Sequence, residues 1–313
     1  MTGAAVGHRT SVRALVALFG AATMLAVTGC TPEPELPSPV VVTGEAEARP
    51  TLRYEIPLVV EDTVVEVIWE GTGPRVVDGQ PILVNYYAEQ GVDGTVINET
   101  YSTEPKPYLL TPEALGLDIH EALSGKRVGS RVLYVAPPGP GEISATVAVF
   151  DLLSTRATGE EVEPREGLPV VTLSPRGEPS VEIPETPPPS ELVVQPLLRG
   201  TGPQVVAGQV ITVQYLRVTW EGDDTESSWD SGSLPVSFPI GVGSVIAGWD
   251  EGLVEQTVGS QVLLIVPPQL AYGGSQNELA EHTLVFVVDI LAASGGPPVN
   301  PTPTPTPTPS SLQ

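Results

Sequence analysis

The chain has 313 residues, of which 41% are hydrophobic and 17% charged, and its formal net charge at pH 7 is −24. An acidic surface of this kind excludes nucleic acid as an expected partner and opposes direct docking on anionic lipid. Cys30 is the single cysteine, so the sequence predicts no intramolecular disulfide and no cysteine-based zinc site.

Residues 1–30 have the features of an export signal. Arg9 and Arg13 precede an apolar run, 14–27, that is too short to span a membrane with confidence. The run ends in the letters VTGC, which resemble a bacterial lipobox, in which small residues expose the bond before the lipid-accepting cysteine. We therefore expect lipid on Cys30 and a protein anchored at the extracytoplasmic face of the cell membrane. An ordinary signal peptide with a chance cysteine is the alternative.

Proline-rich segments flank and divide the rest of the chain. The first is expected to be an extended spacer, and the C-terminal Thr-Pro repeat a solvated, disordered or polyproline tail that could carry O-glycans or touch the cell wall. About 240 residues lie between them, which suits two domains. The predicted division is signal 1–30, linker 31–50, first domain 51–156, acidic linker 157–166, second domain 167–293 with a possible hairpin at 167–190, and tail 294–313.

An internal repeat supports two domains. Residues 71–80 (GTGPRVVDGQ) return 129 residues later as 200–209 (GTGPQVVAGQ), and 128–138 return as 258–268 at an offset of 130. Each half gives, in order, strand, turn, strand, irregular segment, short helix, strand, loop and strand, and runs such as 210–219 and 283–291 are rich in β-branched residues. The predicted fold class is α+β: two domains, each an antiparallel β-sheet wrapped around a short α-helix.

The segment 245–272 is the most specific part of the chain. Val245, Trp249 and Leu253 recur at helical spacing, and Gly259 is expected to stop the helix. A strand at 262–266 follows, then two prolines and a loop that reaches Tyr272. This order and spacing resemble the FKBP-type peptidyl-prolyl cis-trans isomerases, in which the helix tryptophan forms the floor of an apolar cup and the loop tyrosine its rim.

The resemblance implies a set of site residues in the second domain. By position, Trp229, Asp230 and the following serine match the family's Phe-Asp-Ser. The residues implied to be catalytic are Tyr215, Asp230, Ile246, Trp249 and Tyr272, and those implied to bind substrate are Trp229, Val236, Phe238, Val245 and Phe286. The Ile246 backbone N–H and the Tyr272 hydroxyl would bind substrate carbonyls. Each residue also has a simpler interpretation: Trp249 and Phe286 as core, and Tyr272 and Asp230 as turn residues.

The first half keeps the frame but loses the cup. At the repeat offset, Trp249 becomes Ile119, Phe238 becomes Tyr108, Phe286 becomes Ala148, and Asp230 becomes Asn98 or a neighbour, while Tyr86 persists. The loop that carries Tyr272 is missing there, and even in the second half it is short and has no proline. We expect weak activity or none in the first half, which would bind a partner or act as a spacer.

The implied function is peptidyl-prolyl isomerisation that assists the folding of exported proteins, with proline-containing polypeptides as substrates and macrolides as possible ligands. No cofactor is expected, and no metal, because His8, His120 and His282 are scattered and the acidic turn around Glu221 and Asp223 is typical of a solvated loop. The alternative function is a non-catalytic peptide-binding or chaperone lipoprotein. The oligomeric state and the clients do not follow from the sequence.

Overall fold

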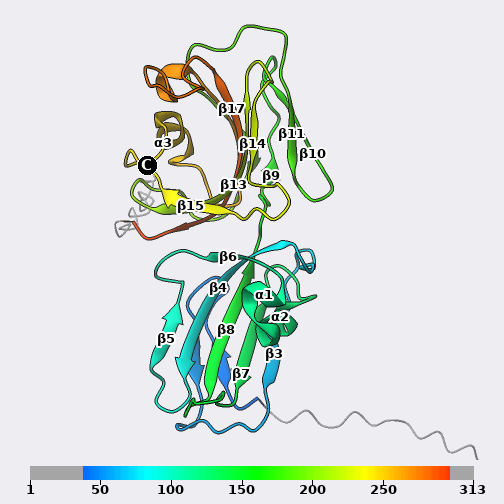
Figure 1. Ribbon diagram of the computed structural model, residues 1–313, viewed down its shortest axis with the longest axis vertical. Coiled ribbons are helices and arrows are strands. Elements are labelled where there is room, and N and C mark those ends of the chain that lie inside the picture. Colours follow the sequence, from blue (N-terminus) through cyan, green and yellow to red (C-terminus); the bar gives the residue numbers. More distant parts are fainter. Residues whose placement is uncertain (1–37, 297–313) are drawn as a thin grey trace, which may run out of the picture. The chain divides into compact units, whose positions relative to one another are not determined.

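The computed structural model describes residues 38–296, so Cys30 and the Thr-Pro tail lie outside the described residues. Two antiparallel sheets dominate this part of the chain, one built from residues before about 155 and the other from residues after it (Figure 1). None of the helices in residues 38–296 is long and apolar enough to span a membrane.

The first sheet has six strands in the order β3-β7-β8-β4-β5, with β6 also paired to β4. Two short helices, α1 and α2, follow β6 in the chain, and the side chains Ala122 and Leu123 of α2 are buried in the core against the sheet. The element bounds are β3 Val64–Trp69, β4 Pro81–Gln90, β5 Val96–Glu99, β6 Lys106–Leu109, α1 Pro112–Leu115, α2 Leu117–Leu123, β7 Arg131–Ala136 and β8 Thr146–Leu153.

The second sheet has seven strands in the order β14-β13-β17-β16-β12-β9, with β15 also paired to β13. Its helix α3 lies on one face, and the predicted strands at 210–219, 262–266 and 283–291 correspond to β13, β16 and β17. The bounds are β9 Glu160–Glu161, β12 Val193–Arg199, β13 Val210–Thr219, β14 Thr225–Ser227, β15 Val236–Pro239, α3 Ala247–Leu253, β16 Gln261–Val266, the 3₁₀ turn η1 Pro268–Leu270 and β17 Leu284–Ser294.

The two sheets repeat one plan. Helices α2 and α3 stand 130 residues apart, and the pairing of Tyr86 with Phe150 in the first sheet has its counterpart in Tyr215 with Val288 in the second. The predicted fold class, two α+β domains each with an antiparallel sheet around a short helix, is confirmed.

A β-hairpin covers the other face of each sheet. In the second half β10 (Val170–Leu173) pairs with β11 (Pro179–Glu182), as the alternating pattern at 167–190 suggested, and their apolar side chains pack on Leu263, Val285 and their neighbours. Strands β16 and β17 are therefore buried on both faces, which explains their unbroken apolar runs.

The predicted spacer at 31–50 is wrong for its second part. Val41–Thr43 forms β1 and pairs with β2 (Thr51–Arg53), and Val40 is only 2% exposed against the outer face of the first sheet. Val40 and the partly buried Val42 bury apolar surface there, a gain that outweighs the nearby prolines.

The predicted acidic linker at 157–166 is also part of the fold. Glu160 and Glu161 form β9 at the edge of the second sheet, and Ala157 is buried with its N–H bonded to Asp289. Backbone pairing with β12 fixes this segment, while the two glutamates stay exposed to water.

Helix α3 ends at Leu253 rather than at Gly259. Gly259 instead allows a close approach of two loops: a Cβ there would lie 3.3 Å from the Cα of Gly200, and the residue has φ of +90°. This contact joins the segment just before β16 to the turn at 200–209, whose sequence has a close counterpart in the first half of the chain at 71–80.

Candidate functional site

Four aromatic side chains meet between α3 and the second sheet. Trp249, 5% exposed, lies with its ring centroid 5.5 Å from Tyr215, 5.1 Å from Phe238 and 5.3 Å from Phe286. Tyr215 and Phe286 meet the indole edge to face, with interplanar angles of 83° in both pairs. We call these four residues the aromatic cluster.

Two glycines of α3 set the position of Trp249. A Cβ on Gly248 would lie 2.4 Å from the Val266 Cγ1 atom, and a Cβ on Gly252 would lie 2.7 Å from a methyl of Leu264. Because both glycines lack a side chain, the helix packs directly on β16. The indole of the intervening Trp249 is thereby held in the cluster.

The loop before α3 leaves a backbone donor free. Ile246 is the N-cap of the helix, and its carbonyl accepts from Trp249 N at 3.0 Å. Within residues 38–296 its own N–H has no hydrogen-bond acceptor. The Asp250 carboxylate holds the loop by accepting from the N–H groups of Gly241 at 2.6 Å and Gly243 at 2.7 Å.

A second free donor comes from the loop after β16. Tyr272 is half-buried and, together with Leu279, packs against the hydrophobic core that contains Trp249 and Phe286. The loop is closed locally, since the Tyr272 carbonyl accepts from Ser275 N at 3.1 Å and from the Ser275 hydroxyl at 2.6 Å. The Tyr272 hydroxyl itself makes no hydrogen bond within the described part of the chain. It therefore remains available to a ligand.

A carboxylate holds the hydroxyl of Tyr215. The phenol donates a short hydrogen bond to Glu226 Oε1, and Arg217 Nε donates to Glu226 Oε2 at 3.3 Å. Burial, followed by the bond to Glu226, raises the pKa of Tyr215, so its hydroxyl stays protonated at any physiological pH.

Asp230 and Trp229 are not brought to the cluster. The Asp230 side chain is exposed and has no hydrogen-bond partner among residues 38–296. Val236 is 37% exposed and lies two residues before Phe238 on β15, so its side chain is on the same face of the strand as Phe238. The Trp229 indole N–H is buried without an acceptor, away from the cluster side chains. The carboxylate beside Tyr215 belongs to Glu226, four residues before Asp230, which the match to the family's Phe-Asp-Ser sequence had indicated.

The structure thus brings together most of the predicted set and adds residues that the sequence reading missed. Strand pairing is the signal that would have found Glu226, because the register of β14 on β13 sets Glu226 opposite Arg217, two residues from Tyr215 and on the same face of the strand. The residues brought together are Tyr215, Phe238, Val245, Ile246, Trp249, Tyr272 and Phe286, and those missed are Glu226, Asp250 and Leu279.

Comparison with known proteins agrees with this geometry. The model of the family "FKBP-type peptidyl-prolyl cis-trans isomerase" matches residues 202–291. An FK506-binding protein of Streptomyces anulatus is 38% identical over 119 residues, which cover 36% of this chain and 95% of that protein. The chain belongs to the FKBP family. A probable FK506-binding protein of Corynebacterium glutamicum is likewise 38% identical over 118 residues, covering 37% of this chain and 98% of that protein.

A solved structure is also similar to this FKBP chain. FkpA from Escherichia coli is 30% identical, and the match covers 42% of this chain and 54% of that one, with a TM-score of 0.32.

The first FKBP-like domain fills the equivalent space differently. Ile119 replaces Trp249, while Tyr134 and Phe150 are buried in its core at positions where the second domain has Leu264 and Val288. Tyr86 lies 6.2 Å from Phe150 between ring centroids. Strand aromatics therefore occupy volume that the helix tryptophan takes in the second domain.

The equivalence of Asn98 also needs correction. Asn98 Nδ2 donates to the Tyr86 hydroxyl at 2.9 Å, as Glu226 accepts from Tyr215 in the second domain. Asn98 therefore corresponds to Glu226 and not to Asp230. The first domain has an amide where the second has a carboxylate.

Proposed function

We propose that the second FKBP domain catalyses cis-trans isomerisation of X-Pro bonds in exported polypeptides. The observation that carries the proposal is the half-buried apolar rim around Trp249 with two donors, the Ile246 N–H and the Tyr272 hydroxyl, that have no acceptor within residues 38–296. A proline ring would pack on the aromatic cluster, and the two donors would bind the carbonyls that flank it.

The chemistry needs no nucleophile. Rotation about a peptide bond has a barrier of about 18–20 kcal/mol, because the planar amide is stabilised by resonance. The twisted transition state has lost this resonance and has a smaller dipole. An apolar surface that removes water from the amide therefore destabilises the planar ground state relative to the transition state.

We assign the polar role near the reacting amide to the Tyr215–Glu226 pair instead of to Asp230. Glu226 fixes the Tyr215 hydroxyl, and Arg217 with Asp224 holds the hairpin: Arg217 Nη1 donates to Asp224 at 3.1 Å. The pair would orient the tyrosine ring against Trp249 and so shape the wall that contacts the proline.

A second candidate function is peptide holding without catalysis, favoured by one observation. The first domain has filled its interior with Tyr134 and Phe150, and Ala148 stands where the second domain has Phe286. It keeps a partly buried Tyr86, Tyr108 and Ile119 at its surface. Such a surface would bind a peptide weakly and without a desolvating cup.

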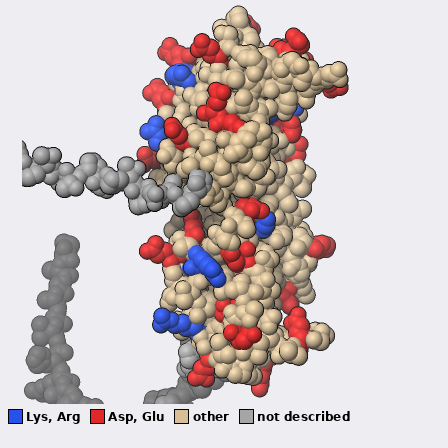
Figure 2. All heavy atoms as spheres, turned by 90° about the vertical axis from the view of Figure 1, so that its left-hand side faces the viewer, with Lys and Arg blue, Asp and Glu red and all other residues tan. Residues whose placement is uncertain are grey.

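Membrane anchoring through Cys30 completes the proposal. It is supported by the leader sequence alone, since Cys30 lies outside the described residues. Cleavage before Cys30 would remove Arg9 and Arg13 and leave a formal charge of −26. Acidic side chains are spread over the face shown in Figure 2, with few basic ones, which is consistent with a protein held at the membrane by lipid and not by its surface charge.

The test uses residues 31–313 and matched variants at equivalent strand positions. Phe238→Ala removes one wall of the aromatic cluster, whereas Tyr108→Ala makes the corresponding change in the first domain. We expect protease-coupled assays on X-Pro peptides to give kcat/KM lower by at least tenfold for Phe238→Ala and unchanged for Tyr108→Ala.

Other results would contradict the proposal. Equal losses in the two variants would assign activity to both domains. A wild-type protein that binds the peptides without accelerating their isomerisation would favour the holding function.

A further inference from the structure

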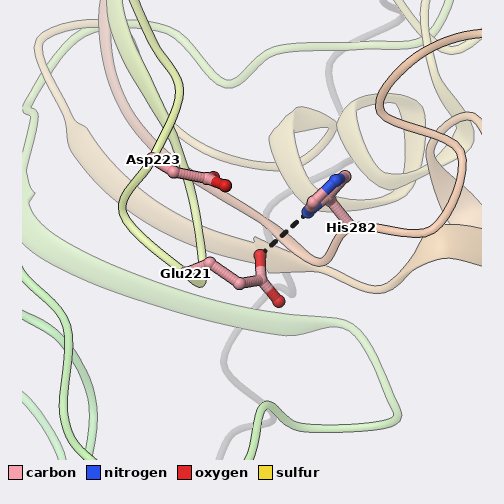
Figure 3. Close-up of side chains that lie close together, drawn as sticks. All are labelled: Glu221, Asp223 and His282. Atoms are coloured by element: carbon pink, nitrogen blue, oxygen red, sulfur yellow. Dashed lines mark hydrogen bonds and ion pairs between the residues drawn. The ribbon is translucent and has the colours of Figure 1, made fainter.

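A histidine and two carboxylates converge on the surface of the second domain, outside the aromatic cluster. Glu221 and Asp223 belong to the turn between β13 and β14, and His282 stands just before β17. One potential ligand atom from each lies within 4.8 Å of the other two, and His282 Nδ1 is 2.9 Å from Glu221 Oε2. Figure 3 shows the Asp223 carboxylate directed toward the same space as the other two groups.

We propose that Glu221, Asp223 and His282 form a binding site for a divalent transition-metal ion of the Zn²⁺ class. One imidazole nitrogen and two carboxylate oxygens, with water as a fourth ligand, make a suitable tetrahedral donor set. Ca²⁺ fits poorly, because it requires six to eight oxygen ligands and the cluster supplies a nitrogen. The proposal departs from the expectation of no metal site, which rested on the scatter of the histidines in the sequence, because folding brings His282 to residues about 60 positions away.

The geometry requires little movement. In a tetrahedral site with ligand bonds of about 2.0–2.1 Å, neighbouring ligand atoms are about 3.3 Å apart. The His282–Glu221 pair is already at 2.9 Å, and these side chains are 31% and 51% exposed, so they can adjust. The Asp223 ligand atom, which lies within 4.8 Å of the other two, would have to move closer to them.

A buried hydroxyl orients the third ligand. Thr219, which is fully buried, donates from Oγ1 to Asp223 Oδ1 at 2.7 Å and accepts from the backbone N–H of Asp223 at 3.2 Å. Asp223 Oδ2 remains open to a metal. A hydrogen bond of this kind from outside the ligand set is what fixes ligating carboxylates in metal sites. The adjacent Asp224 is already paired with Arg217, which leaves it outside the donor set.

A bound ion would connect two segments that border the proposed isomerase site. His282 ends the loop that carries Tyr272 and Leu279, both of which pack against the hydrophobic core that contains Trp249 and Phe286. The other two ligands precede β14, whose Glu226 holds Tyr215. The metal would hold the Tyr272 loop against the β13–β14 turn. The binding site itself does not depend on the proposed isomerase function.

The experiment measures Zn²⁺ binding to an untagged, chelator-treated protein of residues 31–313 by isothermal titration calorimetry and by metal analysis after dialysis. His282→Ala and Glu221→Gln are the test variants. His120→Ala is the matched control, because His120 also pairs with a single carboxylate, Asp78, at 3.2 Å, but has no third potential ligand in the described part of the chain. Thermal unfolding without metal checks that every variant is folded.

We expect one Zn²⁺ per chain in the wild type and in His120→Ala, and an affinity lower by at least tenfold in both test variants. Zn²⁺ should raise the melting temperature of the wild type but not of His282→Ala. The proposal is overturned if the wild type binds no Zn²⁺, if His282→Ala binds as well as the wild type, if His120→Ala loses binding to the same extent, or if Ca²⁺ binds and Zn²⁺ does not.

Discussion

At the residue scale, Trp249 is the point where the apolar packing of α3 and the proposed binding surface coincide. Its ring contacts Tyr215, Phe238 and Phe286, one from each of three strands. A large aromatic residue in such a position contributes both buried area and specific edge-to-face contacts. Stability and activity should therefore depend on it together.

Replacing Trp249 with alanine should lower the free energy of unfolding of the second domain by about 3–5 kcal/mol, because the cavity left by the indole is lined by rigid strands. Activity should fall by more than tenfold. Trp249→Phe keeps part of the contact and should lose less in both respects. Urea unfolding and kcat/KM measured on the same preparations check this, and an unchanged unfolding midpoint in Trp249→Ala would rule out a packed floor.

Glu226 and Asp230 offer a direct comparison between the structural and the sequence-based assignments. Glu226→Gln weakens the bond that orients Tyr215, whereas Asp230→Asn changes an exposed carboxyl that has no partner among the described residues. We expect kcat/KM to fall severalfold in Glu226→Gln, with a loss of about 1 kcal/mol in stability, and to stay unchanged in Asp230→Asn. The reverse order of effects would restore Asp230 to the site.

At the scale of elements, one buried carboxyl on β17 connects the sheet to the segment that enters the second domain. Asp289 accepts from Gln261 Nε2 and from Ala157 N–H, each at 2.7 Å. Burial raises the pKa of Asp289 to about 6, an effect that the two hydrogen bonds and the charge of Arg156 oppose. The equivalent Asp151 of the first domain instead has a buried partner, Arg131, at 2.6 Å.

This difference predicts a pH dependence of stability. Between its unfolded pKa near 4 and the folded value of about 6, Asp289 binds its proton more tightly in the folded state, so its contribution to stability is present at low pH and is lost as pH rises toward 7. The loss is on the order of 2–3 kcal/mol. Asp289→Asn keeps an acceptor for Ala157 and should remove this dependence.

Urea unfolding between pH 4 and pH 7.5, followed by tryptophan fluorescence, checks the prediction, since three of the four tryptophans lie in the second domain. Asp151→Asn is the matched control and should destabilise the first domain throughout this range, because it leaves Arg131 buried without its counter-charge. An identical pH slope in the wild type and Asp289→Asn would contradict the assignment.

At the scale of the whole molecule, the length of the proposed tether follows from where the folded part begins. Because Val40 is packed against the first sheet, only residues 31–39 remain as a spacer after Cys30. At roughly 3.1 Å per residue in polyproline form they would reach about 28 Å at most. The first domain should thus stay close to the membrane if Cys30 carries lipid.

Changing Cys30 to serine in the native host should release the protein from the membrane fraction, because serine lacks the thiol that would take the lipid. Mass spectrometry of the wild-type N-terminal peptide should show the added acyl mass. A variant that remains with the membrane, or a wild-type peptide without lipid, would mean that the anchor is assigned incorrectly.

The sequence by itself determined the architecture. Strand β13 has the predicted bounds, and the helix around Trp249 and the hairpin of β10 and β11 were predicted as well. Each of these elements depends on a pattern within some ten residues. The repeat, in turn, indicated that the chain holds two domains of the same fold. Local patterns failed where an apolar run lay among prolines, at Val40 and β1, and where an acidic strand gains its place only by pairing with β12.

Only the tertiary structure decided which polar groups meet. The partner of Tyr215 depends on the register between β13 and β14, which places Glu226 and not Asp230 beside it. The meeting of His282 with Glu221 requires two loops about 60 residues apart in the sequence to lie side by side, where the end of β13 pairs with the start of β17. Contacts of this kind are set by strand pairing across the whole domain, and the residues near each group in the sequence carry no trace of the partner.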